Sequence, residues 1–126
     1  MDGAAMQFDD WIAGEFAARG AFTALVVLVE IGERSVTPLA STYLNVIGAE
    51  TDWPEIVSLF EGAGVAWDGA SFFPLRSPEG GLLHNDAART GLRDLEARVK
   101  AEPLTLNEGF FCDREGQRMV VEVAAP

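Results

Sequence analysis

Apolar residues recur at three- and four-residue steps in three parts of the chain, which is the spacing of amphipathic helices. The residues that form these stripes are Phe8, Trp11, Ile12 and Phe16, then Ile56, Leu59 and Phe60, and finally Ala88, Leu92, Leu95 and Val99. We expect Gly20 to end the first helix and Pro103 to close the third. Asp52 can cap the second helix, and Gly62 or Gly64 can end it.

Strands are predicted where β-branched and aromatic residues run together or alternate with polar ones. Residues 22–31 are apolar at both parities as far as Glu30, which indicates a strand covered on both faces. The remaining predicted strands are residues 39–47, 65–75, 104–113 and 117–125. Turn sequences should join the first two strands and the last two strands as hairpins.

The turn at residues 113–116 also predicts the register of the last hairpin, because its final glycine suits the left-handed position of a type I turn with a bulge. In this register Phe111 lies opposite Met119 on an apolar face. The same register sets Glu108 opposite Glu122 on the other face. Two carboxylates that face each other across a strand pair destabilise it unless a cation or a proton compensates them.

The predicted order is helix, strand, strand, helix, strand, helix, strand, strand. This order favours an α+β fold in which residues 1–126 form a single domain, with a mixed, mainly antiparallel sheet of about five strands and three helices against it. Three helices would cover one sheet face well and the second face only partly. Because soluble monomers rarely expose a large apolar patch, we expect a homodimer.

The net charge restricts the partners of this domain. The chain has 20 acidic and 9 basic residues and a net charge of −11, although 48% of its residues are hydrophobic. Nucleic acids and anionic membrane surfaces are therefore not expected partners, since both are bound chiefly through Lys and Arg. Proteins, cations and small molecules remain as possible partners. Residues 1–83 hold most of the negative charge, with 12 acidic and 3 basic residues.

Cysteine usage and hydropathy indicate a cytoplasmic protein. Cys112 is the only cysteine, so the chain can form neither an internal disulfide nor a multi-cysteine metal site. The first residues lack the basic start of a secretory signal, and the longest apolar stretch, residues 21–31, is too short to span a bilayer. No nucleotide-binding, zinc-binding or hydrolase motif is present, so we expect neither a cofactor nor a resident metal.

Several aromatic residues could line a ligand pocket. Trp67, Phe72 and Phe73 precede residues 77–81, a stretch of Ser, Pro, Glu and Gly that could act as a mobile cover, and His84 follows it. These four residues would bound a pocket beneath the 77–81 loop. The alternative is that the aromatic side chains simply form the core.

Three groups of polar residues could carry out catalysis or bind a metal, but each also has a purely structural explanation. Cys112 and His84 are the only thiol and imidazole that could form a nucleophile and base, although a lone cysteine on a strand usually packs as a small apolar residue. Glu108 and Glu122 could share a raised pKa or a cation, or both could point to solvent. Residues 84–86 could ligate a divalent ion, but they suit a helix cap better.

These observations favour a small acidic cytoplasmic module that binds another protein without catalysing a reaction, through its negative surface or an exposed sheet edge. The alternative is a small-molecule-binding or catalytic domain, with a site formed by Trp67, Phe72, Phe73, His84, Glu108 and Glu122. A third possibility is a structural subunit, which would carry a broad, flat apolar surface.

Overall fold

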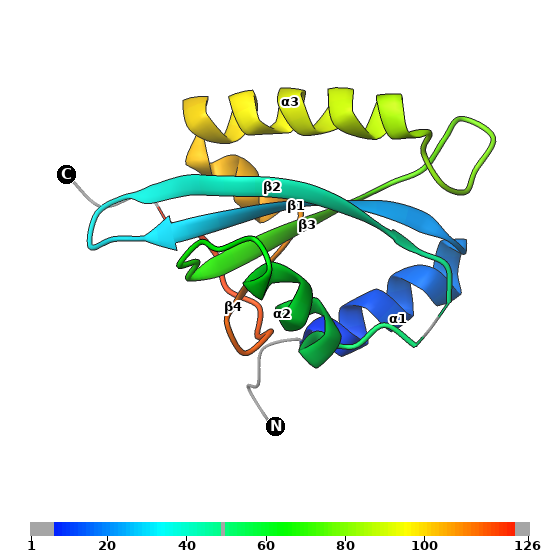
Figure 1. Cartoon of the computed structure of the whole chain (residues 1–126), viewed down its shortest axis with the longest axis horizontal. Coiled ribbons are helices and arrows are strands. Elements are labelled where there is room, and N and C mark those ends of the chain that lie inside the picture. The colour runs from blue at the N-terminus through cyan, green and yellow to red at the C-terminus, as the bar shows by residue number, and fades with distance from the viewer. Residues whose placement is uncertain (1–6, 49, 123–126) are drawn as a thin grey trace.

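An antiparallel sheet separates the helices into two layers (Figure 1). The computed structural model describes residues 7–48 and 50–122. The strand order across the four-stranded sheet is β2-β1-β3-β4. The elements along the chain are α1 (Phe8–Arg19), β1 (Phe22–Ile31), β2 (Val36–Val46), α2 (Trp53–Glu61), β3 (Gly69–Leu75), α3 (Asn85–Ala101), the 3₁₀-helix η1 (Pro103–Glu108) and β4 (Phe110–Asp113). The α+β class predicted from the sequence is confirmed.

The strand β1 is the centre of the structure. It pairs with β2 on one side and β3 on the other, and all of its residues from Phe22 to Val29 are buried. Because successive side chains of a strand point to opposite faces, half of this apolar run packs against each helical layer. The prediction of a strand covered on both faces is confirmed.

The helices α1 and α2 cover one face of the sheet (Figure 1). Phe8 and Ile12 of α1 and Ile56 and Phe60 of α2 are buried against the even-numbered side chains of β1. Two of the caps predicted from the sequence are present, whereas His84, which precedes α3, makes no side-chain cap hydrogen bond. Gly20 follows α1 with a φ of 81°, and the Asp52 carboxylate accepts a hydrogen bond from the Glu55 amide at the start of α2 (3.1 Å).

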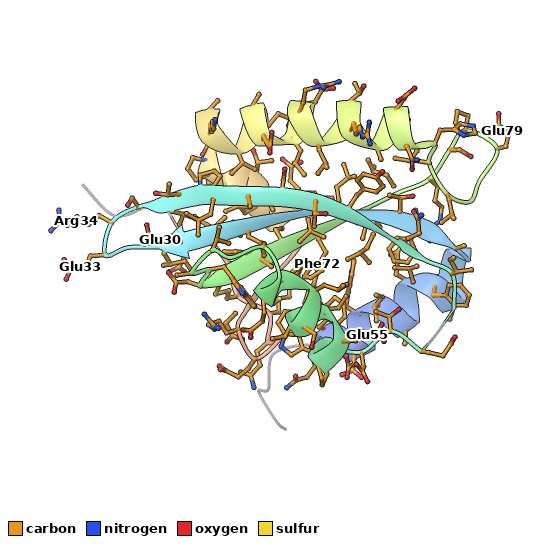
Figure 2. All side chains as sticks on the ribbon, in the orientation of Figure 1. Glu30, Glu33, Arg34, Glu55, Phe72 and Glu79 are labelled. Atoms are coloured by element: carbon orange, nitrogen blue, oxygen red, sulfur yellow. The ribbon has the colours of Figure 1, made fainter. Side chains whose placement is uncertain are left out.

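Phe72 of β3 is the hub of this α1–α2 core, which Figure 2 shows beneath the sheet. Its ring centroid lies 4.8 Å from that of Phe8 and 5.9 Å from that of Phe60. Further rings within 6.2 Å of it belong to Trp11 and Trp53. Such tilted and offset ring pairs stabilise a core beyond the area they bury.

The helix α3 covers the opposite face. Ala88, Leu95 and Val99 are buried and Leu92 is half-buried, so the predicted stripe is confirmed. This α3 core also contains the odd-numbered side chains of β1. The segment that leads into α3 is attached to β1 at Thr23, whose hydroxyl accepts a hydrogen bond from the Leu83 amide (3.0 Å).

The distribution of helices is more even than the prediction that they cover one sheet face well and the second face only partly. Helices lie on both faces, because β1 carries apolar side chains at both parities and each set needs its own cover. The partly uncovered face that led us to expect a homodimer is therefore occupied by α3. The oligomeric state itself remains a prediction.

The prediction of five strands in a mixed sheet is wrong in detail. Over residues 7–48 and 50–122 the sheet has four strands, and all three strand pairs are antiparallel. Residues 104–108 were expected to begin a strand and instead lie in η1. Pro103 starts this helix, the Glu102 carboxylate caps it at the Leu104 amide (3.2 Å), and the Ser71 hydroxyl donates to the Leu106 carbonyl (2.7 Å). Two of these contacts come from Glu102 and Ser71, which lie outside residues 104–108, so the apolar residues of this segment did not indicate the helix.

The final hairpin forms with the predicted turn and register, although its second arm is not a regular strand. Gly116 has a φ of 80°, and its amide donates to the Asp113 carbonyl (3.0 Å). The Met119 amide donates to the Phe111 carbonyl (2.8 Å), as the register requires. The expected strand 117–125 is reduced to isolated bridges, and residues 123–125 lie outside the described residues.

Two strands also differ from prediction in their bounds. The strand predicted at residues 65–75 begins only at Gly69, and the one predicted at 39–47 begins at Val36. Pro38 therefore lies within β2, next to a register shift opposite Leu28 and Val29. An edge strand with a bulge tolerates proline because no neighbour needs its missing N–H. Within the part of the chain that the structure describes, no helix is long and apolar enough to cross a membrane.

The central place of Phe72 can be tested by truncation. We expect Phe72→Ala to lower the free energy of unfolding by about 3–5 kcal/mol, because it empties the space between four other aromatic rings. Urea denaturation followed by tryptophan fluorescence measures this. Leu75→Ala in the same strand is the control, since Leu75 is 40% exposed and should cost about 1 kcal/mol or less. Equal losses would contradict the assigned hub.

Candidate functional site

The structure does not bring the predicted aromatic pocket together. Phe72 and Phe73 are neighbours in β3, so Phe72 packs in the α1–α2 core and Phe73 in the α3 core. Trp67 is 1% exposed and belongs to the α1–α2 core, whereas His84 is exposed at the start of α3. The three aromatic residues are thus core residues on two sides of the sheet.

The 77–81 loop is closed by its own hydrogen bonds. The Ser77 hydroxyl donates to the Gly80 carbonyl (2.7 Å), the Gly80 amide donates to the Ser77 carbonyl (2.8 Å), and the Ser77 amide donates to the Gly81 carbonyl (3.1 Å). Two cavities of the described structure, of about 420 and 430 Å³, lie elsewhere. Neither is lined by Trp67 or His84, and the larger one borders Glu122 near the β1–β2 turn.

Glu108 and Glu122 do not act as a facing pair. Glu108 is the last residue of η1, and its carboxylate forms an ion pair with Arg98 of α3 (2.6 Å). The side chain of the preceding residue, Asn107, bonds to the backbone of Val121, where the prediction had a strand backbone. The Asn107 amide nitrogen donates to the Val121 carbonyl (2.8 Å), and its oxygen accepts from the Val121 amide (2.7 Å). Glu108 therefore has Arg98 as its partner and does not face Glu122 across a pair of strands, as the predicted register required.

Cys112 and His84 are also not placed to react together. Cys112 is fully buried in the α1–α2 core, whereas His84 is exposed where α3 begins over the other face. Burial, and secondarily the negative charge of Asp113, raises the pKa of the Cys112 thiol far above its ordinary value. A protonated, inaccessible thiol is neither a nucleophile nor a metal ligand at neutral pH.

The other polar candidates stabilise the fold. Asn85, within the proposed 84–86 metal triplet, accepts a hydrogen bond from the Tyr43 hydroxyl (3.1 Å). In the described residues no three His, Cys, Asp or Glu side chains gather as metal ligands would. Glu15 of α1 forms an ion pair with Arg76 (2.8 Å), which lies just after β3 and also donates to the Gly20 carbonyl (2.9 Å).

The surface that does combine several features is the free edge of β2. This strand has 11 residues, and β1 is its only pairing strand among the described residues, so its outer side carries N–H and C=O groups that no described strand pairs with. It also contains no charged side chain, in a chain with 29 charged residues (20 acidic and 9 basic). Natural edge strands are usually protected by charges, prolines or bulges. Pro38 and the adjacent bulge protect only the first part of β2, so residues 40–46 remain open.

A groove runs along one side of this edge, between β2 and the C-terminal end of α2. Its volume is about 420 Å³. The side chains that define this β2–α2 groove include Leu28, Ala40, Thr42, Leu44, Leu59 and Phe60. Leu59 is 59% exposed, whereas Leu28 and Phe60 are buried beneath it. The groove therefore offers small and apolar contacts next to the open backbone of the strand.

The helix α3 flanks the other side of the edge. Its contacts with β2 are made by Glu96, whose carboxylate accepts a hydrogen bond from the Ser41 hydroxyl, and by Asn85. Because helix residues four apart share a flank, Arg89 and Lys100 lie on the same side as these two residues, and Arg93 lies next to Arg89. We call Arg89, Arg93 and Lys100 the α3 basic stripe; all three side chains are exposed.

Sequence reasoning proposed an exposed sheet edge but did not locate it at β2 and missed the α3 basic stripe, although both signals were present. Residues 35–49 form a charge-free stretch, and the basic residues of α3 repeat at helical spacing. The strand order places β2 at the edge of the sheet and decides which side of α3 faces it. Neither fact can be read from one segment of the sequence.

Comparison with protein-family models, with curated proteins and with solved structures finds no match to this chain. The chemistry of the site therefore has to be inferred from the geometry of its own residues.

The inert state of Cys112 can be measured. We expect the native protein to react very slowly with a thiol-specific disulfide reagent between neutral pH and pH 8, because a thiol with a raised pKa stays protonated below that pKa. Unfolding in urea should restore an ordinary rate. A Cys112→Ala protein with Ser35→Cys in the exposed β1–β2 turn is the positive control. Rapid labelling of native Cys112 would contradict its burial.

Proposed function

We propose that this chain is a non-catalytic protein-binding module that takes up an extended segment of another protein along the free edge of β2. The uncharged, open edge over residues 40–46 is the observation that carries this proposal. A partner strand added there would bind through main-chain hydrogen bonds, as in β-augmentation.

The backbone of β2 supplies enough unpaired groups for such binding. In an antiparallel sheet every second residue of an edge strand directs both its N–H and its C=O outward. Residues 40–46 therefore present about three or four such residues. Main-chain bonding alone carries no sequence preference, and the β2–α2 groove would supply it by receiving alternate side chains of the partner.

The described side chains support binding better than catalysis. The Cys112 thiol is buried and protonated, the Glu108 carboxylate is held by Arg98, and His84 is exposed without either of them nearby in the fold. The residues proposed for a small-molecule pocket are distributed between the two cores. A lone buried cysteine also fits the cytoplasm, which we retain as the proposed location.

The proposal can be tested with selected peptides. Short peptides chosen from a displayed random library for binding to the chain should contact β2, and hydrogen exchange should show added protection at residues 40–46. Peptides N-methylated at alternate residues separate backbone pairing from side-chain binding. We expect methylation in one alternate phase to abolish binding, because those amides face β2, and methylation in the other phase to have little effect.

Leu59→Glu is the matched protein variant, because it changes an exposed wall of the groove and leaves the buried core intact. It should weaken the selected peptides, whereas Val120→Glu, at a similarly exposed apolar residue (58%) remote from α2, should not. Equal tolerance of both methylation phases, or protection confined to residues outside β2, would refute strand addition.

A further inference from the structure

The two sides of the β2 edge have opposite chemical character, and this difference specifies the segment that fits. We propose that the bound segment alternates carboxylate and apolar side chains, with Asp or Glu toward the α3 basic stripe and small apolar residues in the β2–α2 groove. This inference rests on the proposed function.

Strand geometry separates the two sets of side chains. The residues of β2 that face the α1–α2 core are Ala40, Thr42 and Leu44, which pair with Leu28, Val26 and Ala24 of β1. The alternate residues Ser41 and Tyr43 face α3. A strand added beside β2 continues the same alternation, with its side chains about 4.5–5.5 Å from the facing ones. Half of them must therefore approach α3 and half must approach α2.

The side toward α3 selects carboxylates. Arg89, Arg93 and Lys100 have a combined charge of +3, which is reduced by the Glu96 carboxylate that the Ser41 hydroxyl engages and by Asp86, three residues before Arg89. In the described part of the chain, Arg76 pairs with Glu15, Arg98 with Glu108 and Arg114 with Glu61. No ion pair is found there for the three residues of the stripe, nor for Arg19, Arg34 and Arg118. Three of the 9 basic residues of an acidic protein thus lie along one strand edge, and no described residue forms an ion pair with them.

The side toward α2 selects apolar residues. Leu44 and Ala40 of β2 and Leu59 of α2 form its walls, and Leu28 and Phe60 lie beneath. A charged side chain would lose hydration there without gaining an ion pair, because no lining residue of the groove is charged.

The same charges oppose pairing with a second copy. Two β2 strands related by a two-fold axis would bring the two α3 helices to the same face of the joint sheet, and each basic stripe would face the other. Like charges across an interface disfavour the wrong partner. The stripe therefore selects a foreign acidic segment rather than another molecule of this chain.

Synthetic peptides test this preference directly. A fluorescent peptide that alternates valine and glutamate should bind, and peptides that alternate valine with lysine or serine with glutamate should bind at least about tenfold more weakly. The double variant Arg89→Glu with Arg93→Glu should weaken the valine–glutamate peptide by about tenfold and strengthen the valine–lysine peptide. Fluorescence anisotropy at physiological salt measures both.

The matched control is Arg19→Glu with Arg118→Glu, which changes the net charge equally at exposed residues outside α3. It should leave the preference unchanged. Equal binding of both charged peptides, or equal effects of the two double variants, would overturn this inference. The alternate-methylation result would still stand for strand addition in that case. A dimer in light scattering that Leu59→Glu dissociates would assign the edge to a second copy and would also overturn it.

Discussion

The fold depends on the burial of β1 on both of its faces. Eight successive residues of this strand, from Phe22 to Val29, are excluded from solvent, which is possible only if separate helices cover the two faces and a strand pairs on each side. The even-numbered side chains position α1 and α2, and the odd-numbered ones position α3. The Phe72 cluster attaches α1 and α2 to the neighbouring strand β3, and the Thr23 hydroxyl of β1 holds the start of α3.

This arrangement leaves the two sheet edges in different states. The edge at β4 is only four residues long, and the returning chain pairs with it through the bridge between Cys112 and Arg118. A second bridge, between Gln7 and Gln117, continues the cover toward α1. The edge at β2 is 11 residues long and has only Pro38 and a bulge at one end for protection. An open edge usually promotes aggregation, so its retention favours a specific use.

Local signals predicted the elements that local physics controls. Period and capping predicted α1, the Asp52 cap of α2 and the α3 stripe, and two-sided apolarity predicted β1. The 3₁₀-helix at residues 103–108 was not predictable from its own apolar residues, because the bonds that fix it come from Glu102 and Ser71. The aromatic pocket failed for a reason already in the sequence: Phe72 and Phe73 cannot share one face of a strand. The β2 site required the strand order, which no single segment encodes.

The net charge and the α3 basic stripe act over different distances. At physiological ionic strength the Debye length is about 8 Å, so the charge of −11 repels extended polyanions such as nucleic acids during approach. In the proposed mode of binding, Arg89, Arg93 and Lys100 would act mainly at contact, on carboxylates that backbone pairing has already brought beside α3. A short segment with a few acidic residues meets little long-range repulsion and gains the local attraction. Under the proposed function, an acidic protein would in this way discriminate between a polyanion and an acidic strand, because only the strand would bond to β2 and fill the β2–α2 groove.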